Sequence, residues 1–91
     1  MAAPDKPADD ETALVEALQA GDEGAFQDLY RRLDPTLRRL ARQYARTDAV
    51  AEEIVGETWL AVVKGLDRFE GRSSIRTWIV RILADMAKTR A

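Results

Sequence analysis

Apolar residues recur every three or four positions along most of the chain, which is the spacing of one face of an α-helix. One such stripe contains Phe26, Leu29, Tyr30 and Leu33, and a second contains Leu37, Leu40, Ala41 and Tyr44. No segment alternates apolar and polar residues between turn signals, so strands are not expected. The pattern therefore predicts an all-α fold, a small helical bundle of about four to five helices.

Potential caps and breaks divide the first half of this pattern into helices. Thr12 is suited to begin a first helix that Gly21 ends, and Asp22 is suited to begin the next. Pro35 falls where the first turn of a further helix tolerates a proline.

The second half is predicted to contain two helices and a loop. A longer helix runs from about Ala49 to Lys64, with Thr47 or Asp48 as its cap. Its candidate core positions are Val50, Ile54, Val55, Trp59, Val62 and Val63. Residues 65–74 form the loop, and Ser73 or Ser74 caps the last helix. That helix contributes the candidate core positions Ile75, Trp78, Ile79, Ile82, Leu83 and Met86.

The first residues are acidic, contain prolines and lack an apolar stretch. They do not form a signal peptide, and no apolar run in the sequence is long enough to span a bilayer, so we expect a soluble, cytoplasmic protein. We assign residues 1–11 to a disordered leader and residues 12–91 to a single domain. Ala91 still falls within a helical pattern, which favours a piece of a longer protein.

The composition excludes several kinds of active site. The 91 residues include no His and no Cys, so an imidazole base, a thiol nucleophile and a thiolate metal site are all ruled out. Glu52, Glu53 and Glu57 are candidates for binding a hard cation, but the adjacent pair points in different directions on a helix. We therefore expect no catalytic residue, no metal and no cofactor, and hence not an enzyme.

Charge is segregated along the chain, although its sum is only −2 at neutral pH. Residues 1–29 carry eight acidic side chains and one basic one, and residues 47–67 carry five acidic and one basic. Residues 30–46 and 68–91 each carry six basic side chains, against one and two acidic ones. The net charge argues against a nucleic-acid partner, whereas this division into blocks keeps such a partner open.

The long predicted helix has a polar face opposite its apolar one. That face contains Glu52, Glu53, Gly56, Glu57 and Leu60. Carboxylates around an exposed leucine, with a glycine that removes side-chain bulk, suit docking of a basic partner helix. Two structural alternatives remain open. One is a solvated helix face, and the other is neutralisation across the bundle by an arginine stripe, Arg38, Arg42 and Arg46.

The stretch from Arg68 to Ile82 combines a polar loop with the start of a helix, whose backbone N–H groups attract phosphate. Its loop residues are Phe69, Gly71, Arg72, Ser73 and Ser74. Further cations come from Arg76, Arg81 and Lys88, and further hydrogen-bonding groups from Thr77 and Asp85. Arginine and aromatic residues beside a polar loop are able to hold an unstacked base. Phe69 and Trp78 are equally candidates for the core, and for Trp78 the core is favoured.

Three fragments, in this order and spacing, resemble region 2 of bacterial sigma factors of the extracytoplasmic-function (ECF) group. They are AGDEGAFQDLYRRL, AEEIVGETWL and GLDRFEGRSSIRTWIVRILAD, and the resemblance extends from about Leu14 to Arg90. In that family the second fragment docks on the clamp helices of RNA polymerase, a coiled coil in the largest subunit. The third fragment binds the non-template single strand of the promoter −10 element and captures one flipped base.

Carried over by position, the resemblance implies polymerase contacts at Glu53, Glu57, Thr58 and Leu60. It implies DNA-side positions at Phe69, Gly71, Arg72, Ser73, Ser74, Arg76, Thr77, Trp78, Arg81 and Asp85. An anti-sigma factor is a further implied partner. The family's C-terminal region 4 domain has no counterpart among these residues, so we expect one domain of a longer factor.

Three departures from the family pattern bear on these roles. Gly56 replaces a glutamine of the docking helix, and Asp85 replaces an asparagine near the DNA, which removes amide donors and adds negative charge. Ile79 follows Trp78 where housekeeping sigma factors have a second aromatic residue, which implies weaker melting of promoter DNA. The alternative function is a helical protein-interaction module, such as a domain bound by an anti-sigma factor, that makes no direct contact with DNA.

Overall fold

The computed structural model describes residues 9–90 of the chain. It contains the helices α1 (Asp9–Gln19), α2 (Glu23–Tyr44), α3 (Asp48–Gly65) and α4 (Ile75–Arg90), with a short 3-10 helix, η1 (Leu66–Arg68), directly after α3. No strand occurs between residues 9 and 90. The predicted all-α bundle is therefore confirmed.

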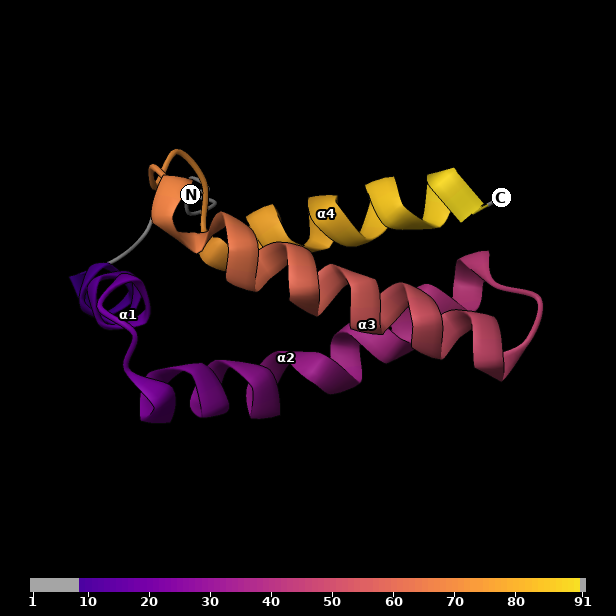
Figure 1. Ribbon diagram of the computed structural model, residues 1–91, viewed down its shortest axis with the longest axis horizontal. Helices are drawn as coiled ribbons and strands as arrows, with labels where there is room; N and C mark the ends of the chain where they lie inside the picture. The colour runs from indigo at the N-terminus through magenta and orange to yellow at the C-terminus, as the bar shows by residue number, and fades with distance from the viewer. Residues whose placement is uncertain (1–8, 91) are drawn as a thin grey trace, which may run out of the picture.

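Helix α3 lies at the centre of the bundle. It packs against α2 on one side and against α4 on the other, as Figure 1 shows. Helix α1 is seen end-on in Figure 1 and contacts the start of α2 and the turn η1. The largest fully buried side chains come from α2, α3 and α4, and they are Leu37, Ile54, Thr58, Val62, Ile79 and Leu83. The core thus fixes the angle between α3 and α4, the two helices that carry the candidate site.

Capping residues begin α2 and α3 at the positions that the sequence predicts. The prediction that Thr12 begins the first helix is wrong, because Thr12 lies inside α1. The Asp22 carboxylate accepts a hydrogen bond from the Ala25 N–H at 3.1 Å, and the Thr47 hydroxyl accepts one from the Val50 N–H at 3.1 Å. Gly21 has a φ of 85°, a conformation that glycine adopts without the steric penalty of a side chain. These contacts set the entry angles of α2 and α3.

The prediction of a new helix near Pro35 is wrong, because α2 continues through this residue without a break. An interior proline removes one backbone hydrogen bond and disfavours a helix by about 3 kcal/mol. Here Leu33 and Leu37 are buried on either side of an exposed Pro35, and they belong to an apolar stripe that runs from Leu29 to Ala41. Burial of that continuous stripe outweighs the local effect of the proline.

Two further sequence expectations differ from the structure. Helix α1 begins at Asp9, so residues 9–11 of the expected leader are helical, while residues 1–8 lie outside the described part of the chain. Val63 is 56% exposed instead of belonging to the core. Its neighbour Val62 is fully buried, and the next side chain on a helix points about 100° away.

Candidate functional site

The polar face of α3 is accessible at most of its predicted positions. Glu52, Glu53, Gly56 and Leu60 are exposed, and Glu57 is half-buried. A Cβ added to Gly56 would meet no other atom within 4 Å, so this glycine is not required by packing. The face therefore has an open site at the place where the family has a glutamine.

Thr58 is wrong as a docking contact, because its side chain is completely buried. Its hydroxyl donates a hydrogen bond of 2.7 Å to the Ile54 carbonyl one turn earlier in α3. With the hydroxyl satisfied inside the bundle, Thr58 serves the packing of α3 and does not belong to its outer face.

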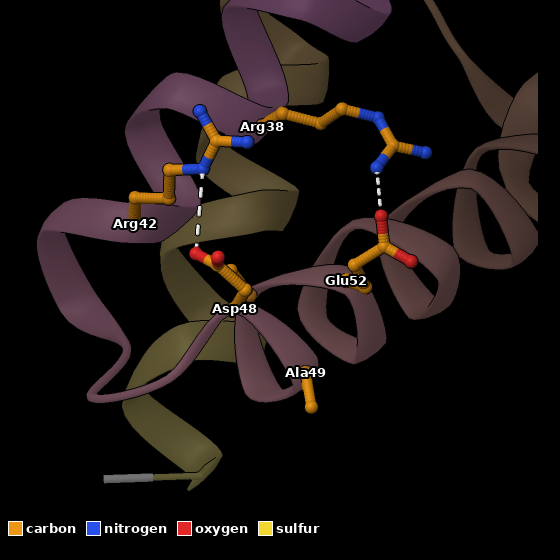
Figure 2. A pocket seen from close by; sticks show the side chains of 6 residues that line it. Arg38, Arg42, Asp48, Ala49 and Glu52 are labelled. Carbon is orange, nitrogen blue, oxygen red and sulfur yellow. Dashed lines mark hydrogen bonds and ion pairs between the residues drawn. The ribbon is translucent and has the colours of Figure 1, made fainter.

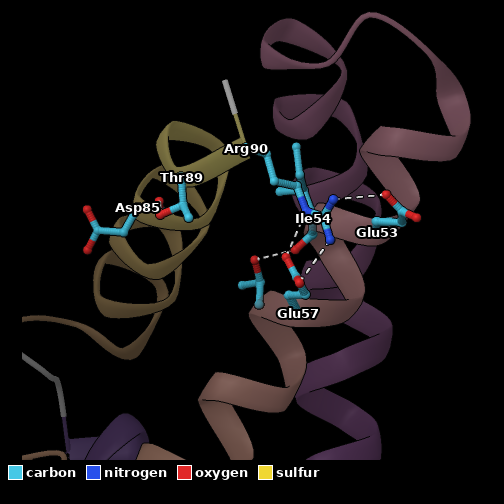
Figure 3. A network of polar contacts seen from close by, with 7 residues as sticks. Glu53, Ile54, Glu57, Asp85, Thr89 and Arg90 are labelled. Atoms are coloured by element: carbon cyan, nitrogen blue, oxygen red, sulfur yellow. Dashed lines mark hydrogen bonds and ion pairs between the residues drawn. The ribbon is translucent and has the colours of Figure 1, made fainter.

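An arginine from α4 binds two carboxylates on the outer face of α3. Arg90 donates from Nε and Nη2 to the two oxygens of Glu57, each at 2.9 Å, and from Nη1 to Glu53 at 3.0 Å. Figure 3 shows this guanidinium lying against both carboxylates, with Asp85 on the opposite side of α4. The hydrogen bonds between Arg90 and Glu57 lower the pKa of Glu57 and raise the pKa of Arg90.

The arginine stripe of α2 reaches only the first part of α3. Arg38 forms an ion pair with Glu52, and Arg42 lies 3.8 Å from Asp48, as Figure 2 shows. Neutralisation across the bundle is thus confirmed for Glu52. Glu53 and Glu57 are paired with Arg90 of α4 instead of with this stripe.

A buried carboxylate anchors the same arginine to the interior. Asp34 accepts a hydrogen bond of 2.7 Å from Arg38 Nε and another of 3.0 Å from the indole N–H of Trp59. Asp34 and Glu52 hold the pKa of Arg38 above its ordinary value. The chain of contacts from Trp59 to Glu52 ties α2 to the inner and outer sides of α3.

The loop before α4 forms a hollow of about 400 Å³. Among the predicted DNA-side residues, Phe69, Arg72, Ser73, Trp78 and Arg81 line it together, joined by Arg68 and Glu70. The rings of Phe69 and Trp78 form one wall with their centroids 5.0 Å apart. Phe69 is 9% exposed and Trp78 is half-buried, so both rings serve the core and still border the hollow.

Local hydrogen bonds determine the shape of this loop. Gly71 has a φ of 75°, which favours glycine at the turn, and Arg72 pairs with Glu70 at 3.1 Å on the surface. The Ser74 hydroxyl accepts a hydrogen bond from the Thr77 N–H at 3.1 Å, so Ser74 is the cap of α4. Ser73 is buried and its hydroxyl donates to the Ser74 carbonyl at 3.0 Å.

The remaining DNA-side positions divide between two sides of α4. Arg81, Asp85 and Lys88 are all exposed and follow the helical spacing that continues from Trp78 and the hollow. Arg76 is also exposed, but it lies about 140° around the helix from Arg81. The structure therefore brings a subset of the predicted residues into one surface and leaves Arg76 apart from it.

Three contacting residues have no signal in the sequence pattern. Gln19 and Glu11 of α1 hydrogen-bond to the backbone around the loop, and Arg90 binds α3. Each contact joins residues at least 33 positions apart in the chain, so it depends on the packing of helices and not on local spacing. Within residues 9–90, no three acidic side chains lie close enough to hold a metal ion, and no helix is long and apolar enough to cross a membrane.

A profile of the family described as Sigma-70 region 2 matches residues 29–90. The chain belongs to the sigma-70 region 2 family. The match includes α3, the loop and α4, which carry the acidic outer face of α3 and the hollow.

Relatives of this sigma region 2 chain include several ECF factors. It is 35% identical over 75 residues to the ECF RNA polymerase sigma-E factor of Salmonella typhimurium and, equally, to that of Escherichia coli. It is 28% identical over 74 residues to the RNA polymerase sigma factor CarQ of Myxococcus xanthus. These matches cover 82%, 82% and 81% of this chain, but only 39%, 39% and 42% of the relatives. The chain thus spans about two fifths of the length of these relatives.

A solved structure has the same arrangement of helices as this sigma region 2 domain. It is the NMR structure of an engineered region 2 of sigmaE in complex with GTAAAA. The TM-score is 0.77 at 28% identity, with 92% of this chain and 90% of that chain covered. Together with the sigma-E relatives, this likeness confirms the resemblance to region 2 of the ECF group.

Proposed function

We propose that this region 2 domain takes part in transcription initiation by binding the single-stranded −10 element of a promoter and docking on RNA polymerase. It acts by binding and not by catalysis, and its place of action is the cytoplasm, where the polymerase works. The observation that carries the proposal is the likeness, over 92% of the chain, to a region 2 that is bound to a short single strand.

The hollow before α4 supports the capture of an unstacked base. Phe69 and Trp78 supply aromatic surface, and Arg72 and Arg81 supply positive charge at its rim. A base edge is read fully only after the base leaves the stack, and an aromatic wall favours that state by stacking. Arg81 and Lys88 are exposed on one side of α4, where they are able to contact phosphates of a bound strand.

The experiment is fluorescence anisotropy with the single strand GTAAAA and a scrambled strand of equal composition. We expect weak, salt-sensitive binding that prefers the ordered strand. Arg81→Ala is expected to weaken binding, whereas Arg39→Ala, which removes an exposed arginine of α2, leaves it unchanged. Equal affinity for both strands would mean that the domain binds the phosphate backbone without capturing a specific base. Absence of binding to either strand would refute the DNA role.

The outer face of α3 supports docking on the clamp helices of the polymerase. Glu53, Glu57 and Leu60 lie on one side of the helix, with the open site at Gly56 between them. Charge reversal by Glu57→Lys is expected to weaken binding to a clamp-helix fragment at moderate salt. Asp28→Lys, on the exposed side of α2, is the matched control. Unchanged affinity for Glu57→Lys would contradict this assignment.

An anti-sigma factor is a further proposed partner, and an exposed apolar region supports it. Val63 borders a hollow of about 550 Å³ that Phe26 and Leu66 also line, and Leu60 is 61% exposed nearby on α3. Apolar surface of this kind is typical of protein interfaces. If no oligonucleotide binds while the clamp fragment does, the domain is a protein-interaction module instead of a DNA-binding one.

A further inference from the structure

We propose that α1 positions the base-capturing loop, with Gln19 holding the beginning of the loop and Glu11 holding its end. This inference rests on the proposed function, because it assigns a role to α1 in binding single-stranded DNA. Neither residue lines the hollow itself, so both act through the backbone of residues 69–75.

At the beginning of the loop, the Gln19 side chain binds two backbone carbonyls. Its Nε2 donates to the Leu66 carbonyl at 2.9 Å and to the Phe69 carbonyl at 3.0 Å. The Phe69 N–H donates to the same Leu66 carbonyl at 3.1 Å, which closes η1. Gln19 therefore clamps both sides of the turn that presents the Phe69 ring to the hollow.

At the end of the loop, Glu11 binds the first residue of α4. Its Oε1 accepts a hydrogen bond of 3.3 Å from the Ile75 N–H. A helix start has unpaired N–H groups and a positive dipole end, both of which favour a carboxylate. The Ser74 hydroxyl accepts a hydrogen bond from the Thr77 N–H, so Glu11 and Ser74 together satisfy two of the first N–H groups of α4.

The two contacts come from one side of α1. Glu11 and Gln19 are eight residues apart, which places them about 12 Å apart along the helix axis and about 80° apart around it. Between them, Val15 and Glu16 face Phe69 and Gly71 across a hollow of about 270 Å³. Across this space, Gln19 and Glu11 hydrogen-bond to the backbone at the two ends of the loop.

Support of this kind matters for binding because a loose loop must be ordered when the strand arrives. The loop contains Gly71 in a left-handed conformation and two serines, a composition that gains much freedom when released. Ordering it in advance removes that entropy loss from the binding step. Loss of either end contact is therefore expected to weaken capture of the strand without altering any residue that touches it.

The experiment compares substitutions that remove or keep the bonding groups in the full chain. Gln19→Leu removes both donors without adding charge, and we expect about tenfold weaker binding of GTAAAA. Gln19→Glu, which turns an oxygen toward the carbonyls, is expected to lose at least as much. Gln43→Glu makes the same charge change on an exposed part of α2 and is the control.

Substitutions at Glu11 distinguish a carboxylate that positions the loop from one that only competes with the phosphates of DNA. Glu11→Gln keeps an oxygen that accepts from the Ile75 N–H and is expected to bind GTAAAA at least as well as the unaltered chain. Glu11→Leu removes the acceptor and is expected to bind several-fold more weakly. If Glu11→Leu instead binds more tightly, the carboxylate only competes with phosphate and its positioning role is refuted.

Amide hydrogen exchange supplies a readout that does not depend on DNA. Gln19→Leu should speed exchange at residues 69–75 and leave the central turns of α3 unchanged. Unchanged exchange together with unchanged GTAAAA binding would refute the positioning role and leave the proposed function intact. If the unaltered chain fails to bind GTAAAA while Gln19→Leu still loosens the loop, the proposed function fails and α1 remains a support of the loop.

Discussion

Asp34 offers the sharpest test of how α2 is fixed to α3. We consider Asp34→Ala, which removes a buried carboxylate that accepts from Trp59 and Arg38. The indole N–H of a Trp59 that is only 8% exposed would lose its partner, at about 1–3 kcal/mol. The Arg38 side chain is 37% exposed and still reaches Glu52. Loss of the ion pair between Arg38 and Asp34 therefore adds at most about 1 kcal/mol. We expect a total loss of about 1–4 kcal/mol in the free energy of unfolding.

Urea unfolding followed by far-UV circular dichroism measures this loss, as a fall of about 1–2 M in the midpoint. The control is Asp28→Ala, because Asp28 and Arg32 repeat the same i,i+4 ion pair one and a half turns earlier in α2. Their side chains are 52% and 77% exposed, so we expect a loss below about 0.5 kcal/mol. Equal losses for the two variants would refute the reasoning, since burial would then have no influence.

The remaining predictions concern the docking face and the loop. Arg90→Ala is expected to return the pKa of Glu57 toward its ordinary value, which NMR titration measures. Because Arg90 lowers the pKa of Glu57, the stability that this ion pair contributes is complete above the ordinary pKa of 4.5 and is lost as the pH falls below that value. The unfolding free energies of Arg90→Ala and the unaltered chain should therefore converge in acid. Gly56→Gln should raise the melting temperature, since it gains about 0.5–1 kcal/mol of helix propensity and its Cβ meets no other atom within 4 Å. Gly71→Ala should destabilise by about 1–2 kcal/mol in urea unfolding, because its φ of 75° disfavours a side chain. Unfolding curves that coincide with the unaltered chain would contradict either glycine prediction.

The fold was largely predictable because its signals are local. The caps at Asp22 and Thr47 and the glycine at Gly21 act within one turn of their own position. The sequence predictions were wrong where packing between helices, and not local sequence, determines the structure. Pro35 lies inside a helix because the leucines around it are buried together, and Val63 is exposed because α2 and α4 cover the other sides of α3.

The candidate site was predictable in its residue types and less so in its contacts. Ordered motifs located the acidic face of α3 and the loop before α4. They did not reveal that Thr58 turns inward, nor that Arg90 binds Glu53 and Glu57. Both facts depend on how α3 and α4 lie against each other, which the spacing of residues in one helix does not specify.

The two tryptophans give the domain a pair of optical reporters in different places. Trp78 borders the hollow before α4, where a stacked base would quench its fluorescence. Trp59 projects from α3 toward α2, where its indole N–H donates to Asp34. Trp59→Phe would leave a single emitter beside the hollow, and Trp78→Phe would leave one that senses the junction of α2 and α3. Changes at the hollow and at the junction of α2 and α3 are thus separable by tryptophan fluorescence without attaching a dye.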